Sequence, residues 1–359
     1  EIRIEPRGAP VLPATDETRI QVRALRITGQ TLYPEAELVS ISGFSPSELS
    51  LTNLRGMAAK ISEHYHRNGY FVAQAYLPPQ DLSNGVVTIA VLEGRYGNIN
   101  LRNSTNLSNT LVNDLLAGLN SGDTIAIAPL ESRLLLLSDL PGVVVKSTLV
   151  PGAAVGTSDL IVDVTPGQRV TGSVEADNAG NRYTGANRIG GTVNLNNPTG
   201  HGDVASLRVL TSGDGLKYGR ASYQTRIGKA TAGIAYAALD YRLGKEFEAL
   251  QAHGTARILT LYGGYPLIRS RATNLNVLVA YDHKRFEDRT DVPPSLTEKK
   301  ARVLSATLYG NHRDHIGAGG LTSYSLTGSA GEIDILTPAA LVTDAAGPRT
   351  NGSFGKLGF

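Results

Sequence analysis

The spacing of apolar residues changes once along the chain, between Leu160 and Asp203, and this change constrains the fold more than any other feature. Before it, apolar residues recur every three or four positions in segments that alternate with short strand-like stretches, which indicates helices among strands. After it, helical spacing disappears and apolar and polar residues alternate, as they do in strands. The sequence therefore predicts an α+β part followed by an all-β part.

The α+β part repeats one order of elements, β-α-α-β-β, in units of roughly 70–80 residues. The first unit is expected to place its strand, two helices and two strands at residues 19–28, 33–40, 50–68, 73–77 and 86–93. The second unit is expected to place the same elements at residues 98–102, 107–119, 129–140, 143–150 and 159–165. A break in alternation between Val22 and Leu25 predicts a β-bulge in the first strand.

These patterns divide the chain into four parts. Residues 1–18 contain three prolines and no periodicity, and they are expected to form an extended linker. Residues 19–95 and 96–166 are the two tandem α+β modules. Residues 167–359 are expected to form an antiparallel β-barrel.

The alternating part favours a barrel that crosses a membrane. Its segments are about ten residues long, the length that a tilted strand needs to span a bilayer. A water-soluble antiparallel sandwich would alternate in the same way. Arginine and glutamine at mid-strand and tyrosines near strand ends favour the membrane, because a lumen accepts the first and an interfacial girdle uses the second. The charged side chains expected to face the lumen are Glu175, Asp177, Arg188, Arg208, Arg220 and Arg226. They would line a hydrated path, or the arginines would pair with Glu175 and Asp177 to brace the wall.

Composition and motifs argue against catalysis, cofactors and nucleic acid. The formal net charge is +2 and only 18% of residues are charged, which is too little basic surface for nucleic-acid binding. Cysteine is absent, so disulfides and cysteine-ligated metals are excluded. No phosphate-binding Gly-x-x-x-x-Gly-Lys loop and no Gly-x-Ser-x-Gly elbow occurs. His312, Asp314 and His315 flank a predicted turn and could hold a metal, but a solvated turn is favoured, and no metal, cofactor or small-molecule substrate is expected.

Two tandem β-α-α-β-β modules before an alternating barrel resemble the polypeptide-transport-associated (POTRA) domains of the Omp85 superfamily. A D-N-x-G-x-x-x-x-G-x-x-R segment at 177–188 and an N-x-x-G-x-G-D segment at 197–203 are similar to those of TpsB transporters of two-partner secretion, the ShlB/FhaC/HecB type. The Gly69–Ala73 passage and the Val91–Gly94 strand end match the same family. Taken together, these features cover about residues 19–359.

The resemblance implies an outer-membrane transporter, in contact with outer-membrane lipid, whose POTRA domains lie in the periplasm. It would recruit an unfolded secreted exoprotein (TpsA, of the filamentous haemagglutinin or haemolysin kind) and move it to the cell surface without ATP. POTRA sheets can accept a strand at an exposed edge. The edge residues expected to bind the exoprotein are Ala73, Gln74, Ala75, Tyr76 and Leu77 in the first module and Val143, Val145 and Ser147 in the second.

Two other functions stay open. One is a barrel-assembly factor or insertase of the same superfamily, and the other is a passive porin with a periplasmic extension. The exported partner could be an adhesin, a cytolysin or a contact-dependent toxin.

The chain also departs from the resembled family in its extent. It has room for roughly nine or ten barrel strands, fewer than the family's closed barrel contains. The plug helix and the V-R-G-Y loop of the family have no counterpart, so we expect an incomplete barrel from a truncated sequence. The first residue is Glu1 and not Met, which suggests a processed or trimmed N-terminus.

Overall fold

The computed structural model describes residues 2–4, 19–213, 215–317 and 319–359. It falls into two compact units. The first contains residues 1–103, 116–134 and 145–164, and the second contains residues 104–115, 135–144 and 165–359. Among the described residues, none of the helices combines the length and the apolar character needed to cross a bilayer.

The first module is a small sheet covered by two helices. Its elements are β2 (Arg19–Val22), β3 (Ala24–Thr28), α1 (Glu35–Ser42), β4 (Ser47–Ser50), α2 (Leu51–Arg67), β5 (Gln74–Tyr76) and β6 (Val86–Leu92). The central strand β6 pairs with β3 in parallel and with β5 in antiparallel orientation. β2 and β4 form a separate antiparallel pair.

Helix α2 supplies most of the helical face of this core. It begins with a capping box, in which the Ser50 side chain accepts from the Asn53 N–H and the Asn53 side chain accepts from the Ser50 N–H. Leu54, Ile61 and Tyr65 lie at helical spacing and are almost fully buried. They belong to one cluster with the buried sheet residues Ile27, Val87 and Ile89. Local sequence and tertiary packing therefore specify the same helix.

The predicted bulge between Val22 and Leu25 is wrong. The chain leaves one sheet at Val22 and enters another at Ala24, because β2 pairs with β4 whereas β3 pairs with β6. The backbone N–H of Arg23 donates to the carbonyl of Gly85 at 2.7 Å and fixes this crossing. β4 was not predicted, because only Leu49 of its four residues is apolar and so short a segment carries no period.

The second module's sheet contains β7 (Arg95–Asn103), β8 (Val143–Pro151) and β9 (Thr157–Pro166), with β7 parallel to β9. Its helices are α3 (Asn109–Leu116) and α4 (Ile127–Ser138). A further strand, β1 (Ile2–Ile4), pairs in parallel with β8 at the edge of this sheet. The linker expected over 1–18 is therefore wrong at residues 2–4, and its remaining residues lie outside the described part of the chain.

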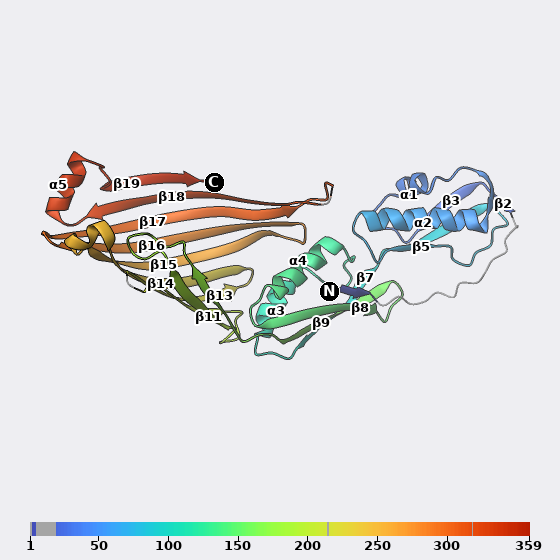
Figure 1. Cartoon of the computed structure of the whole chain (residues 1–359). Coiled ribbons are helices and arrows are strands. Elements are labelled where there is room, and N and C mark those ends of the chain that lie inside the picture. The colour runs from blue at the N-terminus through green and yellow to red at the C-terminus, as the bar shows by residue number, and fades with distance from the viewer. Residues whose placement is uncertain (1, 5–18, 214, 318) are drawn as a thin grey trace. The chain divides into compact units, whose positions relative to one another are not determined.

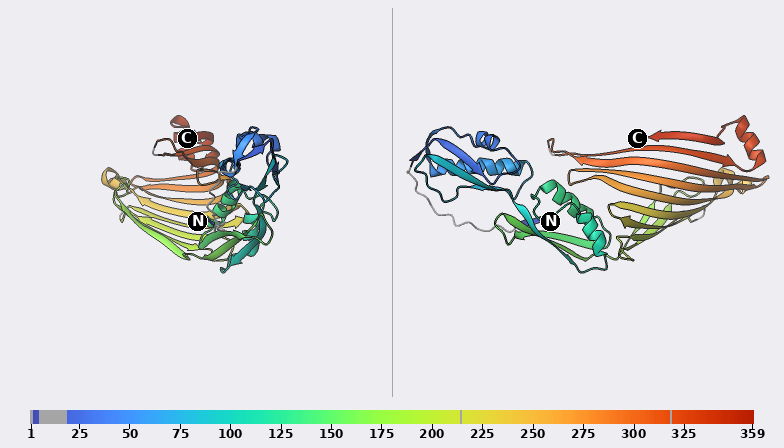
Figure 2. Two further views of the ribbon diagram at one scale, coloured as in Figure 1. Left: turned by 90° about the vertical axis from the view of Figure 1, so that its right-hand side faces the viewer. Right: turned by 180° about the vertical axis from the view of Figure 1, so that it is seen from behind.

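The all-β part is one antiparallel sheet of ten strands in sequence order, β10 to β19 (Figure 1). The elements are β10 (Val170–Asp177), β11 (Arg188–Asn196), β12 (Val204–Thr211), β13 (Leu216–Ile227), β14 (Ala230–Arg242), the 3-10 helix η1 (Lys245–Leu250), β15 (His253–Arg269), β16 (Thr273–Asp291), β17 (Pro294–Arg313), β18 (Leu321–Ile335), α5 (Pro338–Ala346) and β19 (Gly352–Gly358). The sheet curves without closing, because β10 and β19 are not paired in the described chain (Figure 2). The predicted fold class, two POTRA-like modules followed by an incomplete antiparallel barrel, is confirmed.

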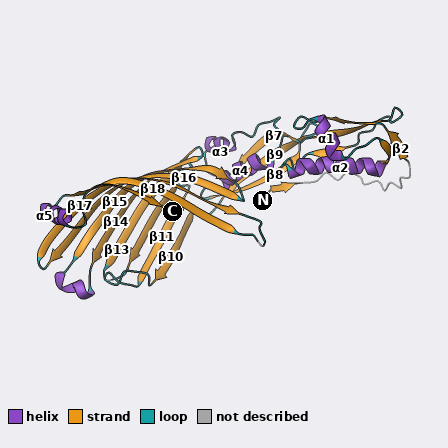
Figure 3. Ribbon diagram, turned by 90° about the horizontal axis from the view of Figure 1, so that it is seen from above, coloured by secondary structure: helices purple, strands orange, loops and turns teal. Residues whose placement is uncertain are grey.

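The later strands are longer than the ten residues expected of a minimal membrane strand. β15, β16, β17 and β18 have 17, 19, 20 and 15 residues. They lie side by side, with α5 at one end of the sheet (Figure 3). At about 3.4 Å per residue, even a strongly tilted strand of this length extends beyond the hydrocarbon layer.

One face of the sheet exposes apolar side chains on successive strands. Val174 is 84% exposed, Leu207 56%, Leu261 49% and Leu304 55%. So wide an apolar surface is unfavourable in water and favourable in lipid. The opposite face, which carries Glu175 and Arg208, is the polar one.

A buried carboxylate joins helix α2 and the segment before α1 to the end of the first module's central strand. The Glu93 side chain is 1% exposed. It accepts hydrogen bonds from the N–H and hydroxyl of Thr31, from the Leu32 N–H at 2.8 Å and from the Tyr65 hydroxyl at 3.0 Å, and Arg95 lies 3.4 Å away. Burial by itself raises the pKa of Glu93, but the hydrogen bonds from Thr31, Leu32 and Tyr65 outweigh it, so the pKa lies below its usual value.

We expect Glu93→Ala to lower the free energy of unfolding of residues 19–166 by about 3 kcal/mol, because four hydrogen-bond donors, among them the buried Tyr65 hydroxyl, lose their acceptor. Urea unfolding followed by circular dichroism measures this change. Glu48→Ala, at an exposed strand position, is the matched control and should change stability little. Equal effects of the two substitutions on the free energy of unfolding would contradict the stabilising role given to Glu93.

The contribution of Glu93 should also depend on pH. A carboxyl group whose folded pKa is depressed adds stability above its unfolded pKa of about 4.3, and this stability is lost as the pH falls through the folded pKa. The stability difference between the natural sequence and Glu93→Ala should therefore shrink as the pH falls from 7 to 3. A constant difference would show that the carboxylate charge is not what stabilises the module.

Candidate functional site: a guarded strand edge and a polar wall

The predicted binding segment of the first module lies at a sheet edge. Gln74 to Tyr76 form β5, which has β6 on one side and no strand on the other among the described residues. The Gln74 and Tyr76 side chains are exposed and that of Ala75 is buried. The flanking Ala73 and Leu77 pack into or against the core of the module.

A groove of about 980 Å³ runs between this edge and α2, which lies beside β5 in Figure 1. The residues that line it from the helix include Leu51, Ala59 and Ser62. On the strand side it is lined by the β5 residues and by Leu77 to Gln80. The groove follows the length of β5, so it has the form that an added extended segment requires.

Two side chains of α2 occupy the backbone groups that point outward from β5. The Ala75 N–H donates to the Ser62 hydroxyl oxygen at 2.8 Å, and His66 Nε2 lies 2.7 Å from the Ala73 carbonyl oxygen. His66 must carry a proton on Nε2 to make this contact. In an antiparallel ladder, successive residues direct their backbone N–H and carbonyl groups to opposite sides of the strand. The backbone groups of Gln74 and Tyr76 therefore point toward β6, while those of Ala73 and Ala75 point toward the groove. The edge is therefore protected by two side-chain bonds and not by a strand.

The second predicted edge is not open along its whole length. Val143, Val145 and Ser147 lie on β8, and β1 pairs with β8 so that Ile2 faces Ser147. The expectation of a strand-accepting edge is therefore wrong at Ser147. Its partner comes from Ile2–Ile4, a stretch too short to show a strand period. Strand β5 is therefore the better candidate for an edge that accepts an added strand.

The polar face of the ten-stranded sheet, called the polar wall below, carries ion pairs on its first strands. Asp177 and Arg188 are direct cross-strand partners, and both carboxylate oxygens accept from the guanidinium group, at 2.9 and 3.1 Å. Glu175 pairs with Arg208 across β11. Arg220 is the direct neighbour of Arg208 on the same face and has no ion pair within the described part of the chain.

Arg226 lies apart from these residues, near the strand ends. It lines a cavity of about 470 Å³ together with Asp139, Gln224, Tyr262 and Arg269. Asp139, just after α4, binds the Arg269 guanidinium group through both carboxylate oxygens, at 2.7 and 2.8 Å. These two residues are 130 positions apart, and no sequence pattern signals their pairing.

The N-x-x-G-x-G-D segment forms a hydrogen-bonded turn between β11 and β12. Asp203 is fully buried and accepts from the Tyr223 hydroxyl at 3.0 Å and from the Thr199 and His201 N–H groups. Asn197 is 4% exposed, and its amide group donates to the Asn106 side-chain oxygen at 3.0 Å. The motif therefore shapes a turn. Asn106, which the sequence analysis missed, extends the turn's hydrogen-bond network to the segment before α3.

The described residues contain no group of three or more side chains placed to ligate a metal. The carboxylate of Asp314 accepts hydrogen bonds from the N–H groups of Ile316 and Gly320 within the turn. The His312 ring contacts the hydroxyl of Thr273 on the neighbouring strand β16.

Comparisons with known proteins agree with this architecture. Residues 20–94 match a ShlB-type POTRA domain, and residues 156–331 match the haemolysin secretion/activation protein ShlB/FhaC/HecB. The chain is 34% identical over 294 residues to the heme/hemopexin transporter protein HuxB of Haemophilus influenzae (strain 86-028NP), covering 81% of this chain and 52% of the relative. It is 32% identical over 183 residues to the outer membrane transporter CdiB of Escherichia coli, covering 51% of this chain and 31% of the relative.

Solved structures show the same fold. CdiB from Escherichia coli superposes with a TM-score of 0.66 at 23% identity, over 90% of this chain and 61% of that one. CdiB from Acinetobacter baumannii superposes with a TM-score of 0.52 at 18% identity, over 90% and 67%.

The modules, the sheet and the matched family models define the class, that of outer-membrane transporters with periplasmic POTRA domains of the ShlB type. The chain belongs to the ShlB/FhaC/HecB family of two-partner secretion (TpsB) transporters and is not an enzyme. It spans about half the length of the curated relatives that it matches.

Proposed function

We propose that this chain recruits an unfolded secreted exoprotein at β5 and passes it along the polar face of the sheet to the cell surface. The observation that carries this proposal is the groove beside an unpaired strand edge in the first module. An extended peptide would add to β5 through main-chain hydrogen bonds, with its side chains in the groove. The family supports the location, because its POTRA domains lie in the periplasm.

Recruitment at this edge is an exchange of hydrogen bonds. The incoming strand would replace Ser62 at the Ala75 N–H and His66 at the Ala73 carbonyl. A protein hydrogen bond contributes about 1 kcal/mol net, so exchanging two of them changes the free energy little. Affinity must then come from side chains in the groove. Binding would be weak and reversible, as a transporter that releases its cargo requires.

Translocation would use the polar wall without nucleotide hydrolysis. The Asp177–Arg188 and Glu175–Arg208 pairs brace the first strands, whereas Arg220 has its charge available to the passing chain. Folding of the exoprotein outside the cell would supply the directional free energy, since a folded product cannot return through the path.

The comparisons favour a kind of exoprotein that is not among the three alternatives named from the sequence. The relative named as a heme/hemopexin transporter matches 81% of this chain, and CdiB of Escherichia coli matches 51%. We therefore propose a secreted TpsA partner that acts on heme or hemopexin, ahead of a contact-dependent toxin.

Ala59→Tyr should fill the groove from the exposed side of α2 without entering the core. We expect it to weaken binding of the unfolded exoprotein to residues 19–166 by about ten-fold, which corresponds to a loss of about 1.4 kcal/mol. Fluorescence anisotropy of a labelled exoprotein segment measures the affinity. Thr52→Tyr adds the same ring to an exposed position of α2 outside the groove and is the control. Equal affinities for both variants would rule out the groove as the binding site.

Arg220→Glu should lower export without preventing insertion, because it reverses an unpaired charge on the polar wall and removes no ion pair. Surface exoprotein measured by antibody labelling, together with the amount of transporter in outer membranes, separates the two effects. Lys245→Glu makes the same charge change at the exposed start of η1. Export at the natural level by Arg220→Glu would contradict a lining role.

A further inference from the structure

Three cations are aligned across the lipid-facing side of the sheet. Arg257 on β15 is the direct cross-strand partner of Arg285 on β16, and Arg285 is the direct partner of Lys300 on β17. Like charges directly opposite one another destabilise a sheet. Within the described part of the chain none of the three has an ion pair. Arg285 Nε lies 3.4 Å from the ring of His283.

Lys300 has a carboxylate, Asp334, as its direct cross-strand partner on β18, but no ion pair joins the two among the described residues. Glu332 and Asp334 bind Arg302, at 2.9 and 3.3 Å. Glu287 binds Arg289 at 2.6 Å. Glu287 and Glu298 form the next row toward the strand ends, and both line a cavity of about 320 Å³ together with the three cations. The row therefore keeps three adjacent cations that form no ion pair in the described part of the chain, although Glu287, Glu298 and Asp334 lie near them.

The same row continues into an apolar depression. Arg257 is the direct partner of Ala238, which faces Gly219, which faces Val209. These small and apolar residues line a depression of about 520 Å³, whose rim also includes Lys217 and Asp240. A Cβ atom at Gly219 would meet no atom within 4 Å, so the space over it is open.

Side-chain alternation places this row on the lipid-facing side. On β15, Arg257 shares its face with Leu259 and Leu261, which are 40% and 49% exposed. On β17, Lys300 shares its face with Leu304. Barrel strands tilt, so a row across them slopes through the bilayer. The apolar end of this row would lie among acyl chains while its cationic end lies among headgroups.

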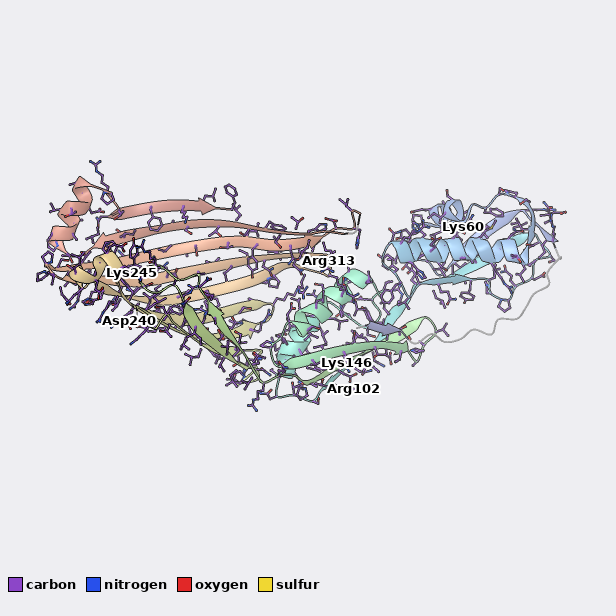
Figure 4. The ribbon with its side chains drawn as sticks, viewed as in Figure 1. Lys60, Arg102, Lys146, Asp240, Lys245 and Arg313 are labelled. Atoms are coloured by element: carbon purple, nitrogen blue, oxygen red, sulfur yellow. The ribbon has the colours of Figure 1, made fainter. Side chains whose placement is uncertain are left out.

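The row lies near one end of the sheet. β10 follows directly after the last strand of the second module, so its first residue marks the periplasmic end. Following the antiparallel strands from there places Asp240 and Lys245 at the opposite end from Arg313, as Figure 4 shows. Asp240 is within two residues of Ala238, the partner of Arg257. The cations therefore face the outer leaflet.

We propose that this row is a binding site for a phosphorylated lipid of the outer leaflet. Arg257, Arg285 and Lys300 would hold the phosphate, and one acyl chain would fill the depression over Gly219 and Ala238. Guanidinium groups match phosphate oxygens in pairs, and an ammonium group adds a point charge, so the set suits phosphate. Basic pockets beside apolar surface are a recurring way to bind lipid headgroups. The proposal rests on the outer-membrane location and not on exoprotein transport.

The test uses the full-length transporter, delipidated in detergent micelles. Thermal unfolding followed by circular dichroism is measured with diphosphorylated lipid A, with a phosphate-free glycolipid that has the same acyl chains, and with inorganic phosphate. A ligand that binds only the folded state raises Tm, and at equal concentration a ligand that binds more tightly raises it more. We expect lipid A to raise Tm, and the other two to raise it much less at equal concentration.

Two variants measure separately how the three charges and the depression contribute to lipid A binding. Joint substitution of Arg257, Arg285 and Lys300 by Gln should weaken lipid A binding by at least about ten-fold. Without lipid its Tm should equal or exceed that of the natural sequence, because repulsion is relieved. Gly219→Leu should weaken lipid A binding while leaving all charges in place. Joint substitution of Arg313, Arg349 and Lys356 by Gln removes the same charge elsewhere and should bind lipid A normally.

Three results would overturn the proposal. The first is equal stabilisation by lipid A and the phosphate-free glycolipid, and the second is equal stabilisation by lipid A and inorganic phosphate. The third is unchanged lipid A affinity in the Arg257, Arg285 and Lys300 variant. Export can be measured on the same variants, so failure of the lipid site and failure of exoprotein transport are distinguishable.

Discussion

The need of every backbone N–H and carbonyl group for a partner governs both units of this structure. A sheet edge leaves a row of such groups unpaired, and each edge in the modules meets this requirement differently. β8 is paired by β1 at its outer side. β5 is covered by the Ser62 and His66 side chains, which can be exchanged for a new strand without unfolding the module. For this reason we propose β5, and not β8, as the edge that accepts a new strand.

Charge is distributed according to the solvent that each face of the large sheet meets. On the polar face the first strands join their charges in the Asp177–Arg188 and Glu175–Arg208 pairs. On the apolar face, Arg257, Arg285 and Lys300 are adjacent and form no ion pair among the described residues, and we propose that they lie at the level of the lipid headgroups. Ion pairs stabilise the polar face, which must keep its shape. Adjacent cations are tolerated on the apolar face where an external anion can bind them.

Sequence periodicity predicted much of the fold, because it reports which side chains are buried. It placed the change of architecture near the end of β9, the repeated module order and the buried face of α2. It could not report pairing partners. The expected bulge was in fact a crossing between two sheets, fixed by the carbonyl of Gly85, and β1 and β4 were too short to show a period. Ser62 and His66 were missed because their role depends on a strand brought alongside α2 only by folding.

The central claim is that an unfolded exoprotein segment adds to β5 as a strand. Amide hydrogen exchange of residues 19–166, with and without that segment, tests it most directly. Exchange should slow at Ala75 and Leu77, whose N–H groups would enter the new ladder, and should be unchanged along β8. Protection confined to β8, or absent from β5 at saturating exoprotein, would contradict the account.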